Sequence, residues 1–357
     1  MIKTQTTSKT CLSGLSEAEM TELTKSLKWP SFKAKQIHSW IYKKWALGFD
    51  DMSDLSKNER SFLKENYDFS YLTLLEKQES QDKTIKFLWK TKDEMLVESV
   101  RMYMDGPGSF SACISSQVGC AVGCPFCATG KLGLKRNLKA EEIVDQILGI
   151  QRITKERISN IVFMGQGEPL QNYSEVLKAI HLIKDSVSIG ARHITLSTSG
   201  IPPLIKKLAD EKLQITLALS LHAPDQRTRE ILVPLARRYN MTELMDSLTH
   251  YYKMTKRRIT FEYVMLEGIN DQIEKAKALA DLVKGIHCHI NLIPYNPILS
   301  DSVFQRPSSG VIQKFKEALE KKSNKKVTIR HERGKDINAA CGQLANIYIN
   351  GSTNTTL

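Results

Sequence analysis

The chain has 357 residues, which is enough to bury a full hydrophobic core and more than one typical domain contains. Apolar residues make up 41% of it and charged residues 25%, no apolar run approaches the ~20 residues of a membrane span, and the N-terminus lacks the apolar segment of a signal peptide. We therefore predict a cytoplasmic protein without a membrane partner, and the formal net charge of +12 favours a polyanionic partner.

Residues 1–75 are predicted to form a small, basic, helical domain. Within it, residues 23–49 contain six lysines, six aromatic residues and no acidic residue. Lysines attract phosphates and exposed aromatic rings stack on bases, so this segment is a candidate RNA-binding surface. Alternatively, Trp40, Ile41 and Trp45 form the core of the domain and the lysines are only solvated; the sequence leaves both interpretations open.

A strand-rich connector is predicted over residues 76–105, where T-I-K-F-L-W-K and M-L-V-E-S-V-R-M have the period of strands. Strands and helices alternate over residues 106–346, and residues 347–357 are expected to be a flexible tail. Such alternation implies parallel strands with helical crossovers, so the predicted fold class is α/β with a full or partial barrel. Strands are expected at 111–116, 160–165, 194–199, 214–222, 259–266, 289–296 and 327–330, and helices at 140–150 and 174–183.

Small and polar residues follow four of these strands. F-M-G-Q-G-E-P ends the second strand, S-T-S-G the third, S-L-H-A-P the fourth and Y-N-P the sixth. Because the C-terminal ends of barrel strands meet at one face, these residues should line a pocket for a polar cofactor. Gly165 and Gly167 would let a ligand approach the backbone, leaving Glu168 to accept hydrogen bonds from an amine or a ribose. Taken singly, Glu168 could instead cap a helix and His222 could be a core histidine.

Three cysteines form the most specific motif. Cys120, Cys124 and Cys127 are spaced C-x3-C-x2-C in a glycine-containing loop after the first barrel strand. Three thiolates from one loop suit an iron-sulfur cluster with one iron left without a protein ligand. A structural zinc site is the alternative, but it usually needs a fourth Cys or His, and the closest histidine downstream is His181 on a predicted helix.

The cysteine spacing, together with G-x-G-E at the second strand, resembles the radical S-adenosylmethionine enzymes. This resemblance implies a partial barrel in which the three cysteines hold a [4Fe-4S] cluster. The iron without a protein ligand would chelate S-adenosylmethionine, whose methionine amine would contact Gly167 and Glu168.

Across almost the whole chain, the sequence is similar to the RlmN and Cfr family of radical RNA adenine methyltransferases. The matching stretches are C-I-S-S-Q-V-G-C, F-M-G-Q-G-E-P-L-Q-N, L-S-L-H-A-P and D-I-N-A-A-C-G-Q-L, which occur in this order. Four separated matches are more specific than the cluster motif alone. Gln166 departs from the family, which usually has Met at this position, and we draw no functional conclusion from it.

The resemblance also implies a mechanism that uses two S-adenosylmethionine molecules per turnover. One would methylate Cys341, because a thiolate is a competent nucleophile. The other would yield a 5'-deoxyadenosyl radical that abstracts hydrogen from this methyl group, and the methylene radical would add to adenine. Glu98 would accept the ring proton, and Cys113 would form a transient disulfide with Cys341 that releases the product. The S-adenosylmethionine site would also include Ser197, Ser220, Leu221, His222 and Asn296.

Within this family the methylated position is carbon 2 or carbon 8 of adenine, and Q-V-G-C and G-E-P are typical of the 2-position type. The implied substrates are an adenosine in the peptidyl-transferase region of 23S rRNA and, in many members, adenosine 37 of tRNAs. An external reductase would deliver electrons. No heptad pattern or long apolar stripe indicates an oligomer, so we expect a monomer.

Three alternatives stay open at this point. The protein could methylate position 8, as the Cfr type does. It could catalyse another radical reaction, such as sulfur insertion, which would leave Cys113 and Cys341 without roles. It could also be an RNA-binding protein with a structural metal. The remaining cysteines, Cys11 and Cys288, match no functional position and are expected to be packing thiols.

Overall fold

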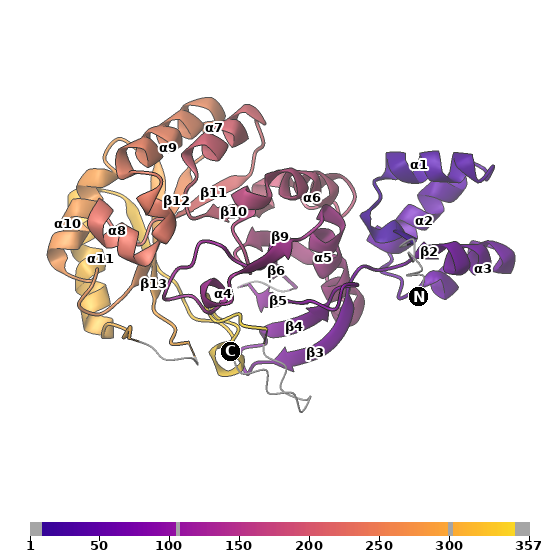
Figure 1. Ribbon diagram of the computed structural model, residues 1–357, viewed down its shortest axis with the longest axis horizontal. Helices are drawn as coiled ribbons and strands as arrows, with labels where there is room; N and C mark the ends of the chain where they lie inside the picture. Colours follow the sequence, from indigo (N-terminus) through magenta and orange to yellow (C-terminus); the bar gives the residue numbers. More distant parts are fainter. Residues whose placement is uncertain (1–8, 105–107, 299–302, 347–357) are drawn as a thin grey trace, which may run out of the picture.

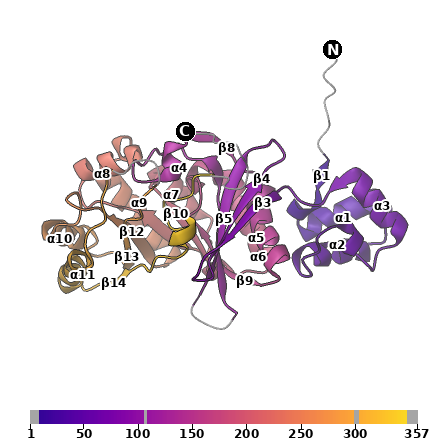
Figure 2. The ribbon, with the colours of Figure 1, turned by 90° about the horizontal axis from the view of Figure 1, so that it is seen from below.

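The computed structural model describes residues 9–104, 108–298 and 303–346, so the predicted tail at 347–357 lies outside the described residues. A helical N-terminal unit lies at one end of the molecule, next to α5 (Ala140–Thr154) and α6 (Tyr173–Asp185) of a larger α/β unit (Figure 1). The second view shows the same end-to-end arrangement (Figure 2). Along the described part of the chain, no helix has the length and apolar character needed to cross a membrane.

The N-terminal unit contains α1 (Glu17–Ser26), α2 (Phe32–Tyr42) and α3 (Lys57–Asn66), and its ends are joined by the short parallel strands β1 (Thr10–Cys11) and β2 (Tyr67–Asp68). Ser16 and Ser56 begin α1 and α3 with capping boxes, in which each hydroxyl accepts a backbone N–H and a glutamate binds the serine N–H in return. Both helices therefore begin where local hydrogen bonding favours it.

The aromatic residues of this unit divide between its core and its surface. Ile41 is fully buried, whereas Trp40 is partly buried and its indole N–H donates to Asp54 at 2.6 Å. The Lys44 ammonium lies 3.7 Å from the Trp40 ring centroid. Phe32 remains 54% exposed. Ile41 thus has the packing role, while Trp40 and Phe32 form part of a surface that also carries lysines.

A buried carboxylate on α5, that of Asp145, connects α5 to the segment that follows the N-terminal unit. Asp145 accepts hydrogen bonds from the Ser70 hydroxyl at 2.5 Å, the Tyr71 N–H at 2.8 Å and the Leu72 N–H at 3.0 Å. Arg152, two helical turns further along, pairs with the same carboxylate at 2.9 Å. Since the charge is both paired and hydrogen-bonded, its burial is compensated, and it fixes the linker against the larger unit.

The larger unit is built on a 10-stranded sheet in the order β14-β13-β12-β11-β10-β9-β6-β5-β4-β3. Strands β3 to β6 are antiparallel, and the strands from β6 to β14 pair in parallel. The order is linear rather than closed, so the predicted partial barrel is confirmed. The strands are β3 (Thr73–Glu79), β4 (Ile85–Lys90), β5 (Leu96–Tyr103), β6 (Phe110–Cys113), β9 (Ile158–Phe163), β10 (Ile194–Thr198), β11 (Thr216–Ser220), β12 (Ile259–Met265), β13 (Cys288–Pro294) and β14 (Lys326–Ile329).

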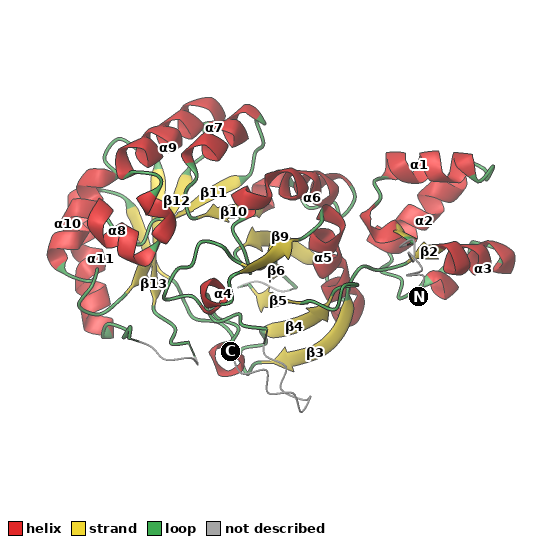
Figure 3. Ribbon diagram, viewed as in Figure 1, coloured by secondary structure: helices red, strands yellow, loops and turns green. Residues whose placement is uncertain are grey.

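Helices surround the parallel strands on the outside of the barrel (Figure 3). Besides α5 and α6 they are α7 (Pro202–Asp210), α8 (Gln226–Leu232), α9 (Met241–Thr255), α10 (Ile273–Leu282) and α11 (Ser309–Ser323). Packing is close where α5 meets the antiparallel strands: a Cβ on Gly149 would lie 2.7 Å from the Trp89 ring. The first strand of the sheet begins at Thr73, whereas the strand-rich connector was expected to begin at residue 76.

Candidate active site

The C-terminal ends of the parallel strands surround a first cavity with about 770 Å³ of empty space. Its walls come from the ends of β9, β10, β11, β12 and β13, where the sequence placed polar groups. The predicted residues that line it are Cys127, Gly167, Glu168, Ser197, Ser220, His222, Asn296 and Cys341. Leu221 is buried and lies outside this lining, so it contributes to the site through its neighbours.

Glu168 is the buried carboxylate of the first cavity. It accepts hydrogen bonds from the Thr198 hydroxyl at 2.7 Å, the Ser199 N–H at 2.6 Å and the Leu170 N–H at 3.0 Å. The last of these caps the short helix at Pro169–Asn172, so the helix-capping alternative and the cavity placement are both correct. Burial raises the pKa of Glu168, and the three donors oppose that effect. An ionised carboxylate has about four lone-pair sites, so an acceptor position remains for a ligand.

Gly167 has a conformation and surroundings that exclude a side chain. Its φ is +102°, and a Cβ there would lie 2.6 Å from Gln117 Cβ and 2.8 Å from Ser116 Oγ. The Glu168 N–H that follows donates to Gln117 Oε1 at 2.8 Å. The bare backbone at residue 167 therefore allows the turn to pack against the loop after β6 and to direct Glu168 into the cavity.

His222 lines the same cavity as Glu168, and its ring is fixed by two contacts. Its Nδ1 accepts the Val264 N–H at 3.1 Å, and the Phe126 ring lies edge-on at 5.1 Å between centroids. Burial, with the nearby Arg229 guanidinium, lowers the pKa of His222 to about 3. The imidazole is therefore neutral at physiological pH, and it can provide a hydrogen bond and packing surface but no charge.

The three motif cysteines lie on the loop between β7 (Gln117–Gly119) and α4 (Ala128–Lys131). Cys120 and Cys124 pack against an apolar cluster that includes Val122 and Leu266, and Cys127 precedes α4. Burial raises the pKa of Cys120 to about 12, and burial followed by the two other thiols raises that of Cys124. Within the described residues, no three His, Cys, Asp or Glu side chains are gathered closely enough to hold a single metal ion.

A second cavity, with about 1380 Å³ of empty space, adjoins the first. Cys113, at the end of β6, lines only the second cavity, whereas Cys341 and Cys127 line both cavities. Although Cys113 and Cys341 lie far apart in the sequence, both line the second cavity. Burial, followed by the Cys341 thiol, raises the pKa of Cys113 to about 12.

The loop that carries Cys341 is held across the site by hydrogen bonds from two other segments, the start of α4 and the residues after β13. The Ala128 N–H donates to Gly342 O at 2.7 Å, the Asn296 amide to Cys341 O at 3.3 Å and the Thr129 hydroxyl to Leu344 O at 2.8 Å. We call residues 339–346 the C-terminal strap.

Comparisons with known proteins agree with this geometry. Residues 114–280 match the Radical SAM superfamily, and residues 10–68 match the ribosomal RNA large subunit methyltransferase N-terminal domain. A probable dual-specificity RNA methyltransferase RlmN of Clostridium novyi is 49% identical over 322 residues, which cover 89% of this chain and 92% of that protein. A protein of the same name from Staphylococcus aureus strain MW2 is 47% identical over 318 residues, covering 88% and 86%. The chain belongs to the RlmN family of radical S-adenosylmethionine RNA methyltransferases.

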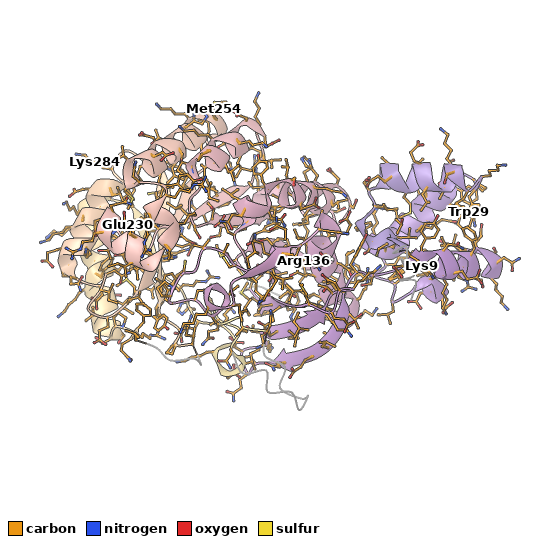
Figure 4. The ribbon with its side chains drawn as sticks, viewed as in Figure 1. Lys9, Trp29, Arg136, Glu230, Met254 and Lys284 are labelled. Atoms are coloured by element: carbon orange, nitrogen blue, oxygen red, sulfur yellow. The ribbon has the colours of Figure 1, made fainter. Side chains whose placement is uncertain are left out.

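A solved structure supports the same conclusion for the fold. A radical SAM methyltransferase from Sphaerobacter thermophilus superimposes with a TM-score of 0.90 at 42% sequence identity, covering 95% of this chain and 100% of that one. As a radical SAM RNA methyltransferase, the protein uses a [4Fe-4S] cluster and S-adenosylmethionine and acts on RNA. The N-terminal RlmN unit, which carries Lys9 and Trp29, lies away from barrel side chains such as Glu230 (Figure 4).

The residues present fit both cofactors. Three thiols on one loop are the donor set that an iron-sulfur cluster requires. In the first cavity, Asn296 Oδ1 and Glu262 Oε2 are buried and have no hydrogen-bond partner among the described residues. Buried polar atoms are rarely left unpaired, and the amine and ribose hydroxyls of S-adenosylmethionine would supply the missing donors.

Glu98 is placed differently from the other predicted site residues of the RlmN family. It lies in the middle of β5, fully buried, 3.3 Å from the Lys86 ammonium, and its Oε2 accepts the Asn346 N–H at 2.9 Å. It lines neither cavity in this conformation. Burial raises its pKa, and Lys86 opposes the shift.

Arg229 is a site residue that the sequence reasoning missed. Its buried guanidinium donates to Ser220 O at 2.8 Å and also to Leu221 O and Ser199 O, so it ties the ends of β10 and β11 together. Burial lowers its pKa to about 10, and Cys124 and Glu168 oppose this shift. One helical turn separates Arg229 from Asp225 at the start of α8, and no local pattern distinguishes it from a solvated arginine.

Proposed function

We propose that this protein methylates the 2 position of a specific adenine in the peptidyl-transferase region of 23S rRNA, and of adenine 37 in tRNAs. The observation that carries the proposal is the position of Cys341 in the wall shared by two cavities, with Cys113 lining only the second. A methyl carrier must face its donor and its acceptor in turn, and a shared wall meets that requirement. The relatives named dual-specificity RNA methyltransferases support two RNA substrates.

In this proposal Cys120, Cys124 and Cys127 hold the [4Fe-4S] cluster. The cluster, when bound, supplies the electron that activates S-adenosylmethionine reductively. The cofactor occupies the first cavity, with its methionine amine on Gly167 and Glu168 and with Ser197, Ser220, His222 and Asn296 around it. Leu221 acts through its backbone: its N–H donates to Glu262 O at 3.0 Å, which fixes the turn that carries His222.

The Cys341 thiolate attacks the methyl group of one S-adenosylmethionine, which breaks the bond from that methyl group to the sulfonium sulfur, releases S-adenosylhomocysteine and leaves S-methylcysteine. A second S-adenosylmethionine would be cleaved with one electron from the reduced cluster, and its 5'-deoxyadenosyl group would take a hydrogen atom from the methyl group on Cys341. The base occupies the second cavity. After transfer, the Cys113 thiolate attacks the Cys341 sulfur, which breaks the bond to the product and forms a disulfide that an external reductant must reduce. Glu98 accepts the ring proton, and its cover by Asn346 implies that the C-terminal strap moves aside for this step. The protein acts as a single chain.

Mass spectrometry of RNA from a deletion strain tests this function. Complementation with the natural gene should restore 2-methyladenosine in 23S rRNA and tRNA, and Cys341→Ala should restore none. Cys113→Ala should leave RNA covalently attached to the protein. Cys288→Ala, a control thiol buried on β13, should behave like the natural protein. Finding 8-methyladenosine would contradict the proposed position, and zinc in place of iron in the purified protein would contradict the cluster.

A further inference from the structure

Arg330 is a cationic residue of the site to which the mechanism above gives no role. It follows β14 directly, and its N–H donates to Leu292 O at 2.8 Å, which continues the ladder between β14 and β13. Its side chain lines both cavities, as does that of Cys341. The strand register therefore places a guanidinium at the junction where the methyl carrier lies.

Among the described residues, the two polar contacts of the Arg330 guanidinium both involve the same nitrogen, Nη1. Its Nη1 lies 4.0 Å from Glu262 Oε2 and 3.6 Å from Met164 Sδ. Glu262 is itself fixed, because its Oε1 accepts the Asn291 amide at 3.0 Å. A guanidinium has five N–H donors in a planar fork, more than these two contacts use. Donors thus remain for a ligand at the junction of the cavities.

Cys113, Cys341 and Arg330 all line the second cavity, so the guanidinium shares this wall with both thiols. An arginine side chain stays protonated in proteins, and Cys341, Glu262 and Cys113 favour its charged form by raising its pKa. Met102 and Met164 form apolar walls of the second cavity next to Cys113. Thioethers pack well against flat aromatic rings, so the cavity offers apolar surface for the faces of a base and one cationic donor at its edge.

We propose that Arg330 binds the target adenine by donating a hydrogen bond to one of the two ring nitrogens that flank carbon 2. This inference rests on the proposed function, which brings carbon 2 up to Cys341. Since nitrogens 1 and 3 are the neighbours of carbon 2, they are the acceptors nearest to a guanidinium beside Cys341. A backbone phosphate is the other possible acceptor, because the Arg330 side chain is 28% exposed, and an RNA that lacks the target base separates the two.

Equilibrium binding of RNA to the anaerobic holoenzyme tests the inference. The protein would carry its cluster and S-adenosylmethionine but no reductant, and fluorescence anisotropy would report affinity for an RNA stem-loop with the 23S rRNA target adenosine. Matched stem-loops would carry 1-deaza-, 3-deaza- or 7-deazaadenosine, or an abasic site, at that position. Arg330→Gln should weaken binding of the adenosine RNA by about tenfold or more, as expected for hydrogen bonds from a charged group.

The effects of Arg330→Gln and of the deaza substitutions on RNA affinity should not be additive. The natural protein should lose affinity for the 1-deaza or 3-deaza RNA, Arg330→Gln should lose nothing further on that RNA, and neither protein should respond to 7-deaza substitution. Arg330→Lys, which keeps the charge beside Glu262, should retain part of the affinity and fold normally. Arg157→Gln, which removes an equal charge from an exposed residue that lines neither cavity and donates to Ser188 O, should bind as the natural protein does.

Three results would overturn the inference. If Arg330→Gln weakened binding of the abasic RNA as much as binding of the adenosine RNA, Arg330 would contact a phosphate. Unchanged binding of the adenosine RNA would mean that Arg330 does not contact it. Sensitivity to 7-deaza substitution alone would mean that Arg330 contacts the other edge of the base. Failure of the natural protein to methylate the adenosine RNA under reducing conditions would instead count against the proposed function. The two failures are therefore distinguishable.

Discussion

The two cavities meet at Cys341 but differ in how their walls are held. In the first, Glu168 and the strand ends around it are fixed by hydrogen bonds of 2.6 to 3.0 Å to backbone and hydroxyl groups. In the second, much of the wall is apolar, and the C-terminal strap closes one side of it. The cofactor site is thus formed before its ligand arrives, while the second cavity depends on a segment that a few hydrogen bonds hold in place.

The largest effect is expected where the two cavities share a wall. Cys127→Ser should remove a cluster ligand and abolish detectable methylation, because a serine hydroxyl is a poor substitute for thiolate at iron. Iron and sulfide analysis with visible absorption would measure cluster loss, and mass spectrometry of RNA would measure methylation. Cys288→Ser, at a buried strand position, serves as the control and should keep its cluster. A fully loaded, active Cys127→Ser protein would show that Cys127 is not a ligand.

The next largest effect is expected at the buried ion pair under the C-terminal strap. Lys86→Met should remove the ion-pair partner of Glu98. Loss of one member of a buried pair costs about 3 to 5 kcal/mol. Because burial already raises the pKa of Glu98 above 4.5, its contribution to stability is present at low pH and is lost as pH rises through the folded value. Without Lys86 this pKa rises further, so the variant should lose more stability at pH 8 than at pH 5.5.

Urea denaturation at the two pH values would measure this difference. The double variant Lys86→Met with Glu98→Gln should recover most of the loss at pH 8, because no charge remains to be buried. Equal destabilisation at both pH values would show that packing, rather than the Glu98 charge, accounts for the effect.

Much of this architecture could be predicted because it depends on local pattern. Alternating β and α segments identified the parallel strands, and parallel strands bring their polar ends to one face whatever their exact register. The cysteine loop was visible because its three thiols are neighbours in the chain. The sequence pattern could not tell which of Trp40 and Ile41 is buried, because both are apolar and occupy consecutive positions of one helix.

The remaining features depend on contacts between distant segments. The sequence did not indicate which way the Gln166 side chain points. In the structure this side chain is buried and its amide donates to Asn346 Oδ1 at 2.7 Å, so it helps to hold the C-terminal strap over Glu98. Arg229 looks like an ordinary arginine until the fold brings α8 to the ends of β10 and β11. Arg330 does so until the register of β14 places it in the cavity walls that also include Cys341. No spacing rule predicts that Lys86 lies beside Glu98. The register between β4 and β5 pairs Leu88 with Glu98 and Lys86 with Val100, which makes Lys86 and Glu98 diagonal neighbours on one face of the sheet.

A pair of glycine substitutions would test how rigid the first cavity is. Gly167→Ala should cost about 3 kcal/mol, from backbone strain at φ +102° together with a clash against Gln117 and Ser116. Gly285→Ala has a similar φ of +80° but open space around its Cβ position, so it should show the strain alone, about 1 kcal/mol. Thermal denaturation and S-adenosylmethionine affinity would be measured for both, and only Gly167→Ala should weaken cofactor binding. Equal losses would mean that the turn can shift to admit a methyl group.

The smallest effect should come from loosening the strap. Thr129→Val removes the hydroxyl that donates to Leu344 O at 2.8 Å, and Thr255→Val removes a buried hydroxyl that donates at 2.8 Å to Tyr251 O within α9. Each should lower the free energy of unfolding by about 1 kcal/mol, the usual contribution of one hydrogen bond. Hydrogen exchange should separate them, because only Thr129→Val should speed exchange in residues 339–346. If both variants left the strap equally protected, its position would depend on packing rather than on this hydrogen bond, and the contrast between the two cavities would be weaker than their contacts indicate.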